Sequence, residues 1–151
     1  MSKQIVKTGS VAQPIGPYSL GVRSGNLVFV SGTVGWRPDG SVAGGIKEQC
    51  HQMFKNVQQV LRAIGSGLDH VVTTTTYLVH ASDYQALNEV RAQYFATDPP
   101  ASAVVVVKEL VRPDLLVEIE AVAEIPPKGP RPASGSRRSV RKVKQVKRRG
   151  R

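Results

Sequence analysis

Two carboxylates near the end of the chain, Glu118 and Glu120, are the first candidates for chemistry. They lie within Leu115–Ala123, a run of apolar and β-branched residues that predicts a strand. Because side chains alternate along a strand, both carboxylates share one face, and the apolar residues share the other (Val117, Ile119, Ala121 and Ala123). The carboxylate face also carries Val122, so we expect it to line a pocket or a subunit interface, with a solvent-exposed sheet surface as the alternative.

Other reactive residue types do not form a recognisable motif. None of the three histidines, His51, His70 and His80, is spaced with Cys, Asp or Glu as a metal site requires, so no metal site is expected. Gly44-Gly45 precedes a predicted helix but lacks the lysine and the spacing of a phosphate-binding loop. Cys50 lies on the apolar stripe of that helix, which favours a core position over a nucleophile.

The first part of the domain is predicted to open with strands. Leu27–Ser31 is a short apolar run that follows a turn at Ser24-Gly25-Asn26, and Tyr18–Arg23 would be its hairpin partner. Residues 46–64 follow as a helix that ends at Gly65, because apolar residues recur there at spacings of three and four (Ile46, Cys50, Met53, Val57, Val60, Leu61 and Ile64).

The second part alternates strands with one more helix. Val71–Leu78 is a predicted strand, and Ser82 or Asp83 would cap a helix that ends before Asp98-Pro99-Pro100. The apolar face of this helix comprises Ala86, Leu87, Val90, Tyr94 and Phe95. Two strands complete the order β-β-β-α-β-α-β-β, at Ala103–Val107 and Leu115–Ala123. The strand-only opening argues against a doubly wound parallel sheet and predicts an α+β fold, a mixed sheet with two helices on one face.

The charge of the 151-residue chain is concentrated at one end. The whole chain carries 21 Lys+Arg and 11 Asp+Glu, a formal net charge of +10. Residues 128–151 hold 11 of the basic residues and no acidic one, which leaves 10 basic and 11 acidic residues, a net charge of −1, in residues 1–127. The sequence therefore predicts one domain at 1–127 and a basic, disordered C-terminal tail at 128–151.

Several partners and locations are compatible with such a tail. It would allow nonspecific contact with nucleic-acid phosphates, but it has no aromatic residue for base stacking. A solvated extension without a specific partner, a nuclear address and a basic amphipathic helix carrying Val140, Val143 and Val146 are the alternatives. The longest apolar run, Ala103–Val107, is too short to span a membrane, and the N-terminus lacks a signal peptide. We expect no membrane contact and a cytoplasmic location, or a nuclear one if the tail is an address.

An ordered set of short segments resembles the Rid family, also called the YjgF family. The similarity runs from about residue 4 to about residue 124. It rests on Ile15-Gly16-Pro17-Tyr18, Leu27 to Gly32, Gln49, Asn56-Val57, Asp83-Tyr84, Leu87-Asn88-Glu89, Tyr94-Phe95, Pro100-Ala101 and Val117 to Ala123. The resemblance implies a chorismate-mutase-like α+β fold and a homotrimer with ligand clefts between subunits. It further implies hydrolysis of reactive enamines and imines to 2-oxo acids and ammonia, without a cofactor.

The resemblance also implies roles for individual residues. Glu118 would position the attacking water and act as the catalytic group, and four further residues would line the cleft (Tyr18, Ser31, Gly32 and Asn88). In the family an arginine in a Pro-Ala-Arg segment holds the substrate carboxylate, but this chain has Ser102 at that position, and Val104 stands where several members carry a cysteine. Ser102 and Val104 would thus also contact the substrate. A serine hydroxyl cannot replace a bidentate guanidinium. We therefore expect weak or absent activity on the usual 2-imino acids, unless another cation such as Arg23 or Arg112 substitutes.

Three functions remain open on the sequence alone. The first is a hydrolase of enamine or imine metabolites with non-standard substrate specificity. The second is a non-catalytic, ligand-binding or regulatory trimer. The third is an RNA-associated protein, of the ribonuclease or translation-inhibitor type, which uses the basic tail. The sequence does not decide whether the chain is an enzyme.

Overall fold

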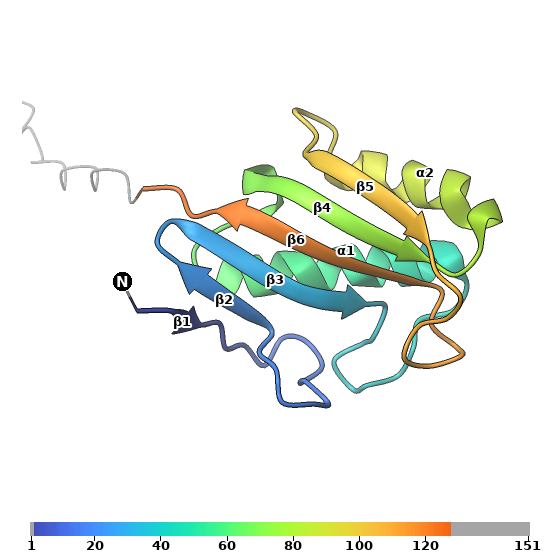
Figure 1. The fold of residues 1–151 in the computed structure, drawn as a ribbon, viewed down its shortest axis with the longest axis horizontal. Helices are drawn as coiled ribbons and strands as arrows, with labels where there is room; N and C mark the ends of the chain where they lie inside the picture. Colours follow the sequence, from blue (N-terminus) through green and yellow to red (C-terminus); the bar gives the residue numbers. More distant parts are fainter. Residues whose placement is uncertain (1, 128–151) are drawn as a thin grey trace, which may run out of the picture.

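A six-stranded mixed sheet forms one layer of the domain, and two helices cover one of its faces (Figure 1). The computed structural model describes residues 2–127, so the predicted tail at 128–151 lies outside the described residues. The strands are β1 (Gln4–Ile5), β2 (Gly21–Ser24), β3 (Leu27–Val34), β4 (Val71–Leu78), β5 (Ala101–Val106) and β6 (Val117–Glu124). Their order in the sheet is β1-β2-β3-β6-β4-β5; β4 and β5 pair in parallel, and the other neighbours are antiparallel. This is the predicted α+β architecture.

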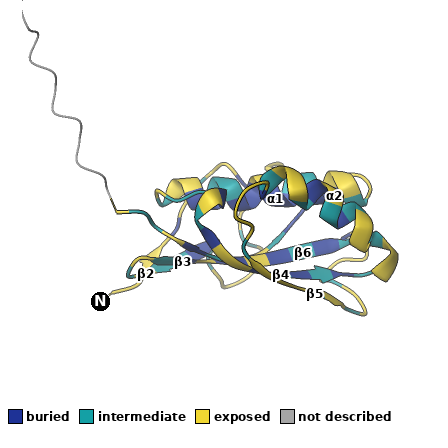
Figure 2. Cartoon of the chain, turned by 90° about the horizontal axis from the view of Figure 1, so that it is seen from above, coloured by how far each residue is buried: buried dark blue, intermediate teal, exposed yellow. Residues whose placement is uncertain are grey.

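The two helices bury their apolar stripes against the sheet. Helix α1 (Ile46–Ala63) packs on β3 and β6, and helix α2 (Tyr84–Tyr94) packs beside α1. Cys50 and Met53 of α1 are fully buried, as the periodicity predicts, and Phe54, which was not predicted, is fully buried as well. Gly65 follows the helix with a φ of 81°, a left-handed conformation that glycine adopts at no steric cost. Figure 2 shows the buried residues between the two layers, with the exposed ones on the outer side of the helices.

Several boundaries differ from the sequence-based expectation. Strand β3 continues three residues beyond Ser31, and β5 begins at Ala101 instead of Ala103 because Ala101 and Ser102 pair with β4 despite their low strand propensity. Tyr18 lies in the loop before β2, and β6 begins at Val117. Asp83 is the residue preceding α2, but its side chain makes no capping hydrogen bond, because a short 3₁₀ turn leads directly into the helix.

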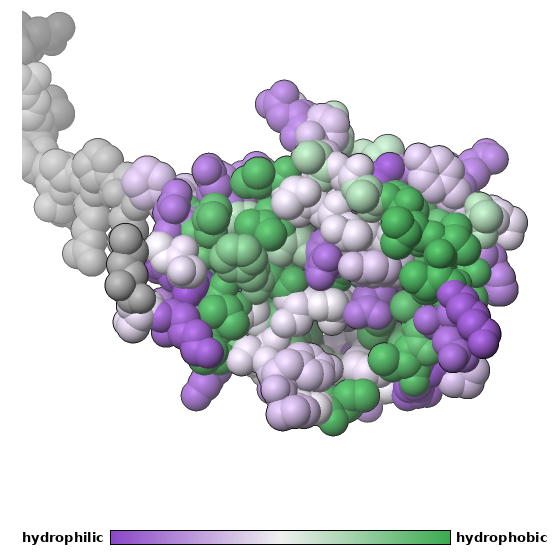
Figure 3. Space-filling model, viewed as in Figure 1, coloured by the Kyte–Doolittle hydropathy of each residue, from purple (hydrophilic) through white to green (hydrophobic). Residues whose placement is uncertain are grey.

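The sheet presents two chemically different faces. Alternate residues of β6 from Val117 to Ala123 are buried under the helices, which confirms the predicted apolar face. The opposite, open face carries Glu118 and Glu120, together with apolar side chains such as Phe29, which is 46% exposed. Figure 3 views this open face and shows apolar patches separated by polar residues. No helix in the described part of the chain is long and apolar enough to cross a membrane.

Candidate functional site

A β-bulge in β3 forms the centre of the candidate site. The register runs from the pair Val30–Ala121 to the pair Thr33–Ile119, so Ser31-Gly32 on β3 faces a single residue of β6. A bulge bends its strand and turns local side chains and peptide groups away from the regular ladder, and bulges are frequent beside active sites. The Ser-Gly pair predicted to line a cleft is thus an irregularity in the middle of a strand rather than its end.

The bulge allows the Glu118 carboxylate to lie directly against the backbone of β3. A Cβ atom on Gly32 would lie 3.1 Å from Cδ of Glu118 and closer still to Oε1, so a side chain at this position would displace the carboxylate. Glu118 is half-buried, and no hydrogen bond from residues 2–127 reaches its carboxyl group. The carboxylate is therefore placed by the shape of the bulge and remains open to a ligand.

The surroundings of Glu118 favour its protonated form. Burial raises the pKa of the Glu118 carboxyl, and the nearby charge of Glu120 raises it further. Glu120 has a partner of its own, because the hydroxyl of Tyr77 donates a hydrogen bond to its Oε1 at 3.1 Å, which raises the pKa of Tyr77. The two glutamates on this face thus differ: Glu120 is hydrogen-bonded, whereas Glu118 is suited to exchange a proton with a bound molecule.

A cleft of about 440 Å³ surrounds the Glu118 carboxylate. Its wall comprises Ile15, Tyr18, Ser31, Gly32, Val34, Trp36, Val111, Glu118 and Glu120. This volume suits a small metabolite. The Ser31 hydroxyl donates to the carbonyl of Ser19 at 2.6 Å, which leaves its oxygen as an acceptor for a ligand. The structure therefore brings Tyr18, Ser31, Gly32 and Glu118 together in one cleft.

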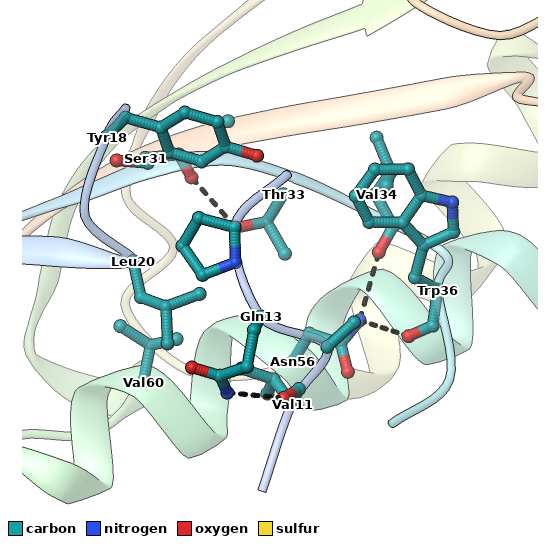
Figure 4. A pocket seen from close by; sticks show the side chains of 13 residues that line it. Val11, Gln13, Tyr18, Leu20, Ser31, Thr33, Val34, Trp36, Asn56 and Val60 are labelled. Atoms are coloured by element: carbon teal, nitrogen blue, oxygen red, sulfur yellow. Dashed lines mark hydrogen bonds between the residues drawn. The ribbon is translucent and has the colours of Figure 1, made fainter. Parts of the chain in front are cut away.

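Buried amides hold the wall of this cleft in place. The side chain of Asn56 donates to the carbonyls of Val34 and Trp36 at 3.0 and 2.7 Å, which fixes the chain just after β3 (Figure 4). Gln49, only 1% exposed, ties the loop between β5 and β6 to α1. Its Nε2 donates to the carbonyl of Asp114 at 2.8 Å, and its Oε1 accepts from the backbone N–H of Leu116 at 2.9 Å.

A second cluster lies at the edge of the sheet, where α2 meets β5. Asn88 and Ser102 line a cleft of about 410 Å³ there, together with Arg91 and Thr74. Nη1 of Arg91 donates to Oγ of Ser102 at 2.8 Å, and Nη2 donates to Oδ1 of Asn88. Val104 packs against the hydrophobic core and lines neither cleft.

The two clusters lie on opposite faces of the sheet. Ser102 is in register with Thr74 of β4, and Glu118 is in register with Tyr77 of the same strand. The Cα atoms of Ser102 and Glu118 are roughly 14 Å apart, because three residues along β4 and two strand spacings lie between them. Since side chains alternate along a strand, an offset of three residues places the two side chains on opposite faces of the sheet. A small ligand bound to one chain therefore cannot touch both Glu118 and Ser102.

Arg91 is the functional candidate that the sequence-based prediction missed. Arg23 donates to the carbonyl of Gly25 at 2.8 Å, and Arg112 forms a bidentate pair with Asp114, with distances of 3.0 and 2.6 Å. Neither lines either of these clefts. Arg91 follows Asn88 by three positions on a predicted helix, so a check of the helix face would have found it.

Cys50 and the three histidines line neither of these clefts. Cys50 is fully buried, and burial raises its pKa to about 12, which confirms its assignment to the core. Nδ1 of His51 lies 2.9 Å from the Tyr94 hydroxyl, and His70 lies beside Asp69. Within residues 2–127, no group of three or more His, Cys, Asp or Glu side chains is arranged to hold a metal ion.

Comparisons with known proteins agree with this architecture. The family model described as Endoribonuclease L-PSP matches residues 8–125. A RutC family protein of Pyrococcus horikoshii is 38% identical over 123 residues, covering 80% of this chain and 97% of its own. The human 2-iminobutanoate/2-iminopropanoate deaminase is 35% identical, covering 80% of this chain and 89% of its own.

Solved structures extend the similarity to three dimensions. RidA of an Antarctic Psychrobacter superposes with a TM-score of 0.78 at 34% identity, covering 81% of this chain and 99% of that one. TdcF of E. coli, solved with bound serine, superposes with a TM-score of 0.77 at 30% identity, covering 80% of this chain and 98% of that one. On these grounds the chain belongs to the Endoribonuclease L-PSP family, which is the Rid (YjgF) family.

Proposed function

We propose that this protein hydrolyses reactive imines, and the enamines that tautomerise to them, to carbonyl compounds and ammonia. The observation that carries the proposal is the half-buried Glu118 carboxyl, which lies against the bulge at Gly32 in a metabolite-sized cleft and has a raised pKa. Relatives named as 2-iminobutanoate/2-iminopropanoate deaminases support the same reaction class.

The reaction would need one proton-transfer group and a water molecule. Water adds through its oxygen to the imine carbon, and Glu118 in its ionised form accepts a proton from that water and passes it to the imine nitrogen. In the resulting carbinolamine, Glu118 moves the hydroxyl proton to the nitrogen as the C–N bond breaks, which releases ammonia and leaves the carbonyl. Ser31 can accept a hydrogen bond from the substrate nitrogen, and the backbone N–H of Gly32 is proposed as a donor. No step requires a cofactor.

The proposal includes assembly into a homotrimer with the ligand bound between copies. The open face of the sheet exposes apolar residues such as Phe29 and Val105, at 46% and 42%, which favours contact with another chain. Glu118 lies on this face, whereas Asn88 and Ser102 lie beside α2 on the other. A neighbouring copy would complete the site by placing its α2–β5 edge over the Glu118 cleft. Light scattering or sedimentation of the purified chain tests the trimer directly.

Ammonia release from imines generated in situ tests the activity. An amino-acid oxidase supplies 2-imino acids, and amines oxidised to neutral imines supply substrates without a carboxylate. We expect the protein to accelerate ammonia release from at least one class, and Glu118→Gln to abolish the acceleration. If no ammonia appears above the uncatalysed rate with either class, while Ser102→Arg creates the activity, the native chain is not a deaminase. A ligand-dependent rise in melting temperature without turnover would then indicate a binding protein.

A second candidate function, contact with RNA, is favoured by the charge of residues 128–151. These 24 residues carry 11 Lys+Arg and no acid, and the matching family model is described as an endoribonuclease. We expect binding that is independent of sequence and falls steeply with salt concentration. Comparison of the full chain with the 1–127 fragment tests this, since equal RNA affinity of the two would contradict a role for the tail. A cytoplasmic location remains a prediction from the sequence.

A further inference from the structure

Within the part of the chain that the structure describes, the guanidinium of Arg91 lies in a cleft without a neutralising partner. Arg91 is partly buried between α2 and β5, and its two hydrogen bonds go to neutral oxygens, Oγ of Ser102 and Oδ1 of Asn88. Among residues 2–127 it forms no ion pair with an Asp or Glu side chain. Arginine carries five N–H donors in a planar fork, and only two of those of Arg91 are used within the described part of the chain.

A buried hydroxyl in the same cleft also lacks a partner among the residues that the structure describes. Thr74 is 2% exposed, lines the cleft with Arg91, and its Oγ1 makes no hydrogen bond within residues 2–127. Buried polar groups are rarely left unpaired, because each unpaired group carries a desolvation cost. Within residues 2–127, a guanidinium with free N–H donors and no ion pair thus lines the same cleft as a hydroxyl without a hydrogen bond, which indicates that this cleft is complementary to an anion with two oxygens, such as a carboxylate.

We propose that Arg91 holds the carboxylate of the substrate, so that the preferred substrates are 2-imino acids. Ser102 and Asn88 orient the fork from two sides, and the Thr74 hydroxyl donates to one carboxylate oxygen. This assignment rests on the proposed function, because the imine carbon must reach a Glu118 supplied by a neighbouring copy. It replaces the expectation, drawn from Ser102 alone, that carboxylated imines are poor substrates. The E. coli relative solved with serine, an amino acid that carries a carboxylate, is consistent with it.

Binding of a 2-oxo acid, measured without chemistry, tests the assignment independently of catalysis. Pyruvate is titrated into the full-length protein and followed by isotope-detected NMR of the arginine side chains and by melting temperature. We expect pyruvate to shift the Arg91 signals of the wild type and to raise its melting temperature. Arg91→Met should abolish both effects, and Arg62→Met, at an exposed position on α1, should retain them. If pyruvate fails to bind the wild type at millimolar concentration, or binds Arg91→Met equally well, the assignment is wrong.

Catalysis adds a readout that a merely structural role would not change. Loss of a charged partner for a carboxylate weakens an interaction by about 30-fold to several thousand-fold, so kcat/KM of Arg91→Met on 2-imino acids should fall in that range. Its activity on neutral imines should stay within about threefold of the wild type. The double variant Arg91→Met/Ser102→Arg removes the guanidinium from α2 and introduces one on β5, at the residue that Arg91 contacts in the wild type. It should recover activity on the carboxylated substrate.

Failure of this assignment is distinguishable from failure of the proposed function. If the wild type binds pyruvate through Arg91 but hydrolyses no imine, the anion site stands and the hydrolase proposal fails. If imines are hydrolysed but Arg91→Met affects carboxylated and neutral substrates equally, the hydrolase proposal stands and the carboxylate assignment is overturned. Melting temperatures of all variants confirm that each remains folded.

Discussion

Replacement of Gly32 by alanine is the sharpest test of how the bulge positions Glu118. The added Cβ would lie 3.1 Å from Cδ of Glu118 and nearer still to Oε1. Because non-bonded carbon atoms prefer separations of about 3.5–4.0 Å, the carboxyl carbon must retreat by roughly 0.4–0.9 Å, and the oxygen further. The carboxyl group ends a flexible side chain, so it can move without a shift of the sheet. We expect a small change in stability and a large change in catalysis.

The size of the catalytic effect follows from that displacement. A misplacement of about 1 Å at the reacting groups costs on the order of 100-fold in rate, or about 2.7 kcal/mol in the activation barrier. Gly32→Ala should therefore lower kcat/KM for imine hydrolysis by about 100-fold, while its melting temperature stays within a few degrees of the wild type. Steady-state ammonia release and a thermal melt measure the two quantities on the same preparation.

Two controls isolate the cause. Gly9→Ala is the matched substitution, because a Cβ atom at Gly9 would meet no atom within 4 Å, and it should leave activity unchanged. In a Glu118→Gln background, Gly32→Ala should add little further loss, because the catalytic carboxylate is already absent and the two effects are not additive. Wild-type activity of Gly32→Ala, or a full additional 100-fold loss in the Glu118→Gln background, would refute the proposed placement of the carboxylate by the bulge.

The remaining predictions concern stability, titration, reactivity and assembly. Gln49→Leu should destabilise the protein by about 2–4 kcal/mol in urea unfolding, because it leaves backbone groups of the β5–β6 loop unpaired. The control Gln93→Leu, at an exposed position, should change the free energy of unfolding by less than about 0.5 kcal/mol. Because the pKa of Glu118 is raised in the folded protein, ionisation of its carboxyl group destabilises the wild type as pH rises through that pKa. Glu118→Gln should therefore gain stability relative to the wild type between about pH 4 and pH 7. A difference in unfolding free energy that stays constant across this range would contradict the prediction. Cys50 should resist a thiol reagent at about pH 8 until urea unfolds the chain, since its pKa is about 12 and it is fully buried; labelling of the native protein would disprove this. Finally, an equal mixture of the Glu118→Gln and Arg91→Met chains, refolded together, should contain about a quarter of intact sites if each site takes Glu118 from one copy and Arg91 from another. If a site lies within one chain, the mixture should contain no intact site.

Local sequence patterns predicted most of the fold because the physical rules behind them are local. The three-and-four spacing of apolar residues in 46–64 defines one face of a helix, and the alternation in β6 separates Glu118 from its apolar neighbours. The beginning of β5 could not be predicted in this way. Ala101 and Ser102 have little intrinsic preference for a strand and become one only because β4 supplies parallel hydrogen-bonding partners.

The same distinction applies to the site. Tyr18, Ser31, Gly32 and Glu118 could be proposed from the family resemblance, and the structure brings them into one cleft. Their resemblance-based partners Asn88 and Ser102 lie on the other face of the sheet, a separation that depends on strand order and register rather than on any single segment. Val104 faces the core for the same reason.

The sequence by itself determined the α+β class, the family and the concentration of positive charge beyond residue 127. Only the tertiary structure decided that a guanidinium lies beside Ser102. Arg91 extends from α2, and the parallel pairing of β4 and β5 holds the Ser102 hydroxyl 2.8 Å from its Nη1. Proximity between residues distant in sequence is set by packing, and packing places the charge of Arg91 in the cleft at the α2–β5 edge.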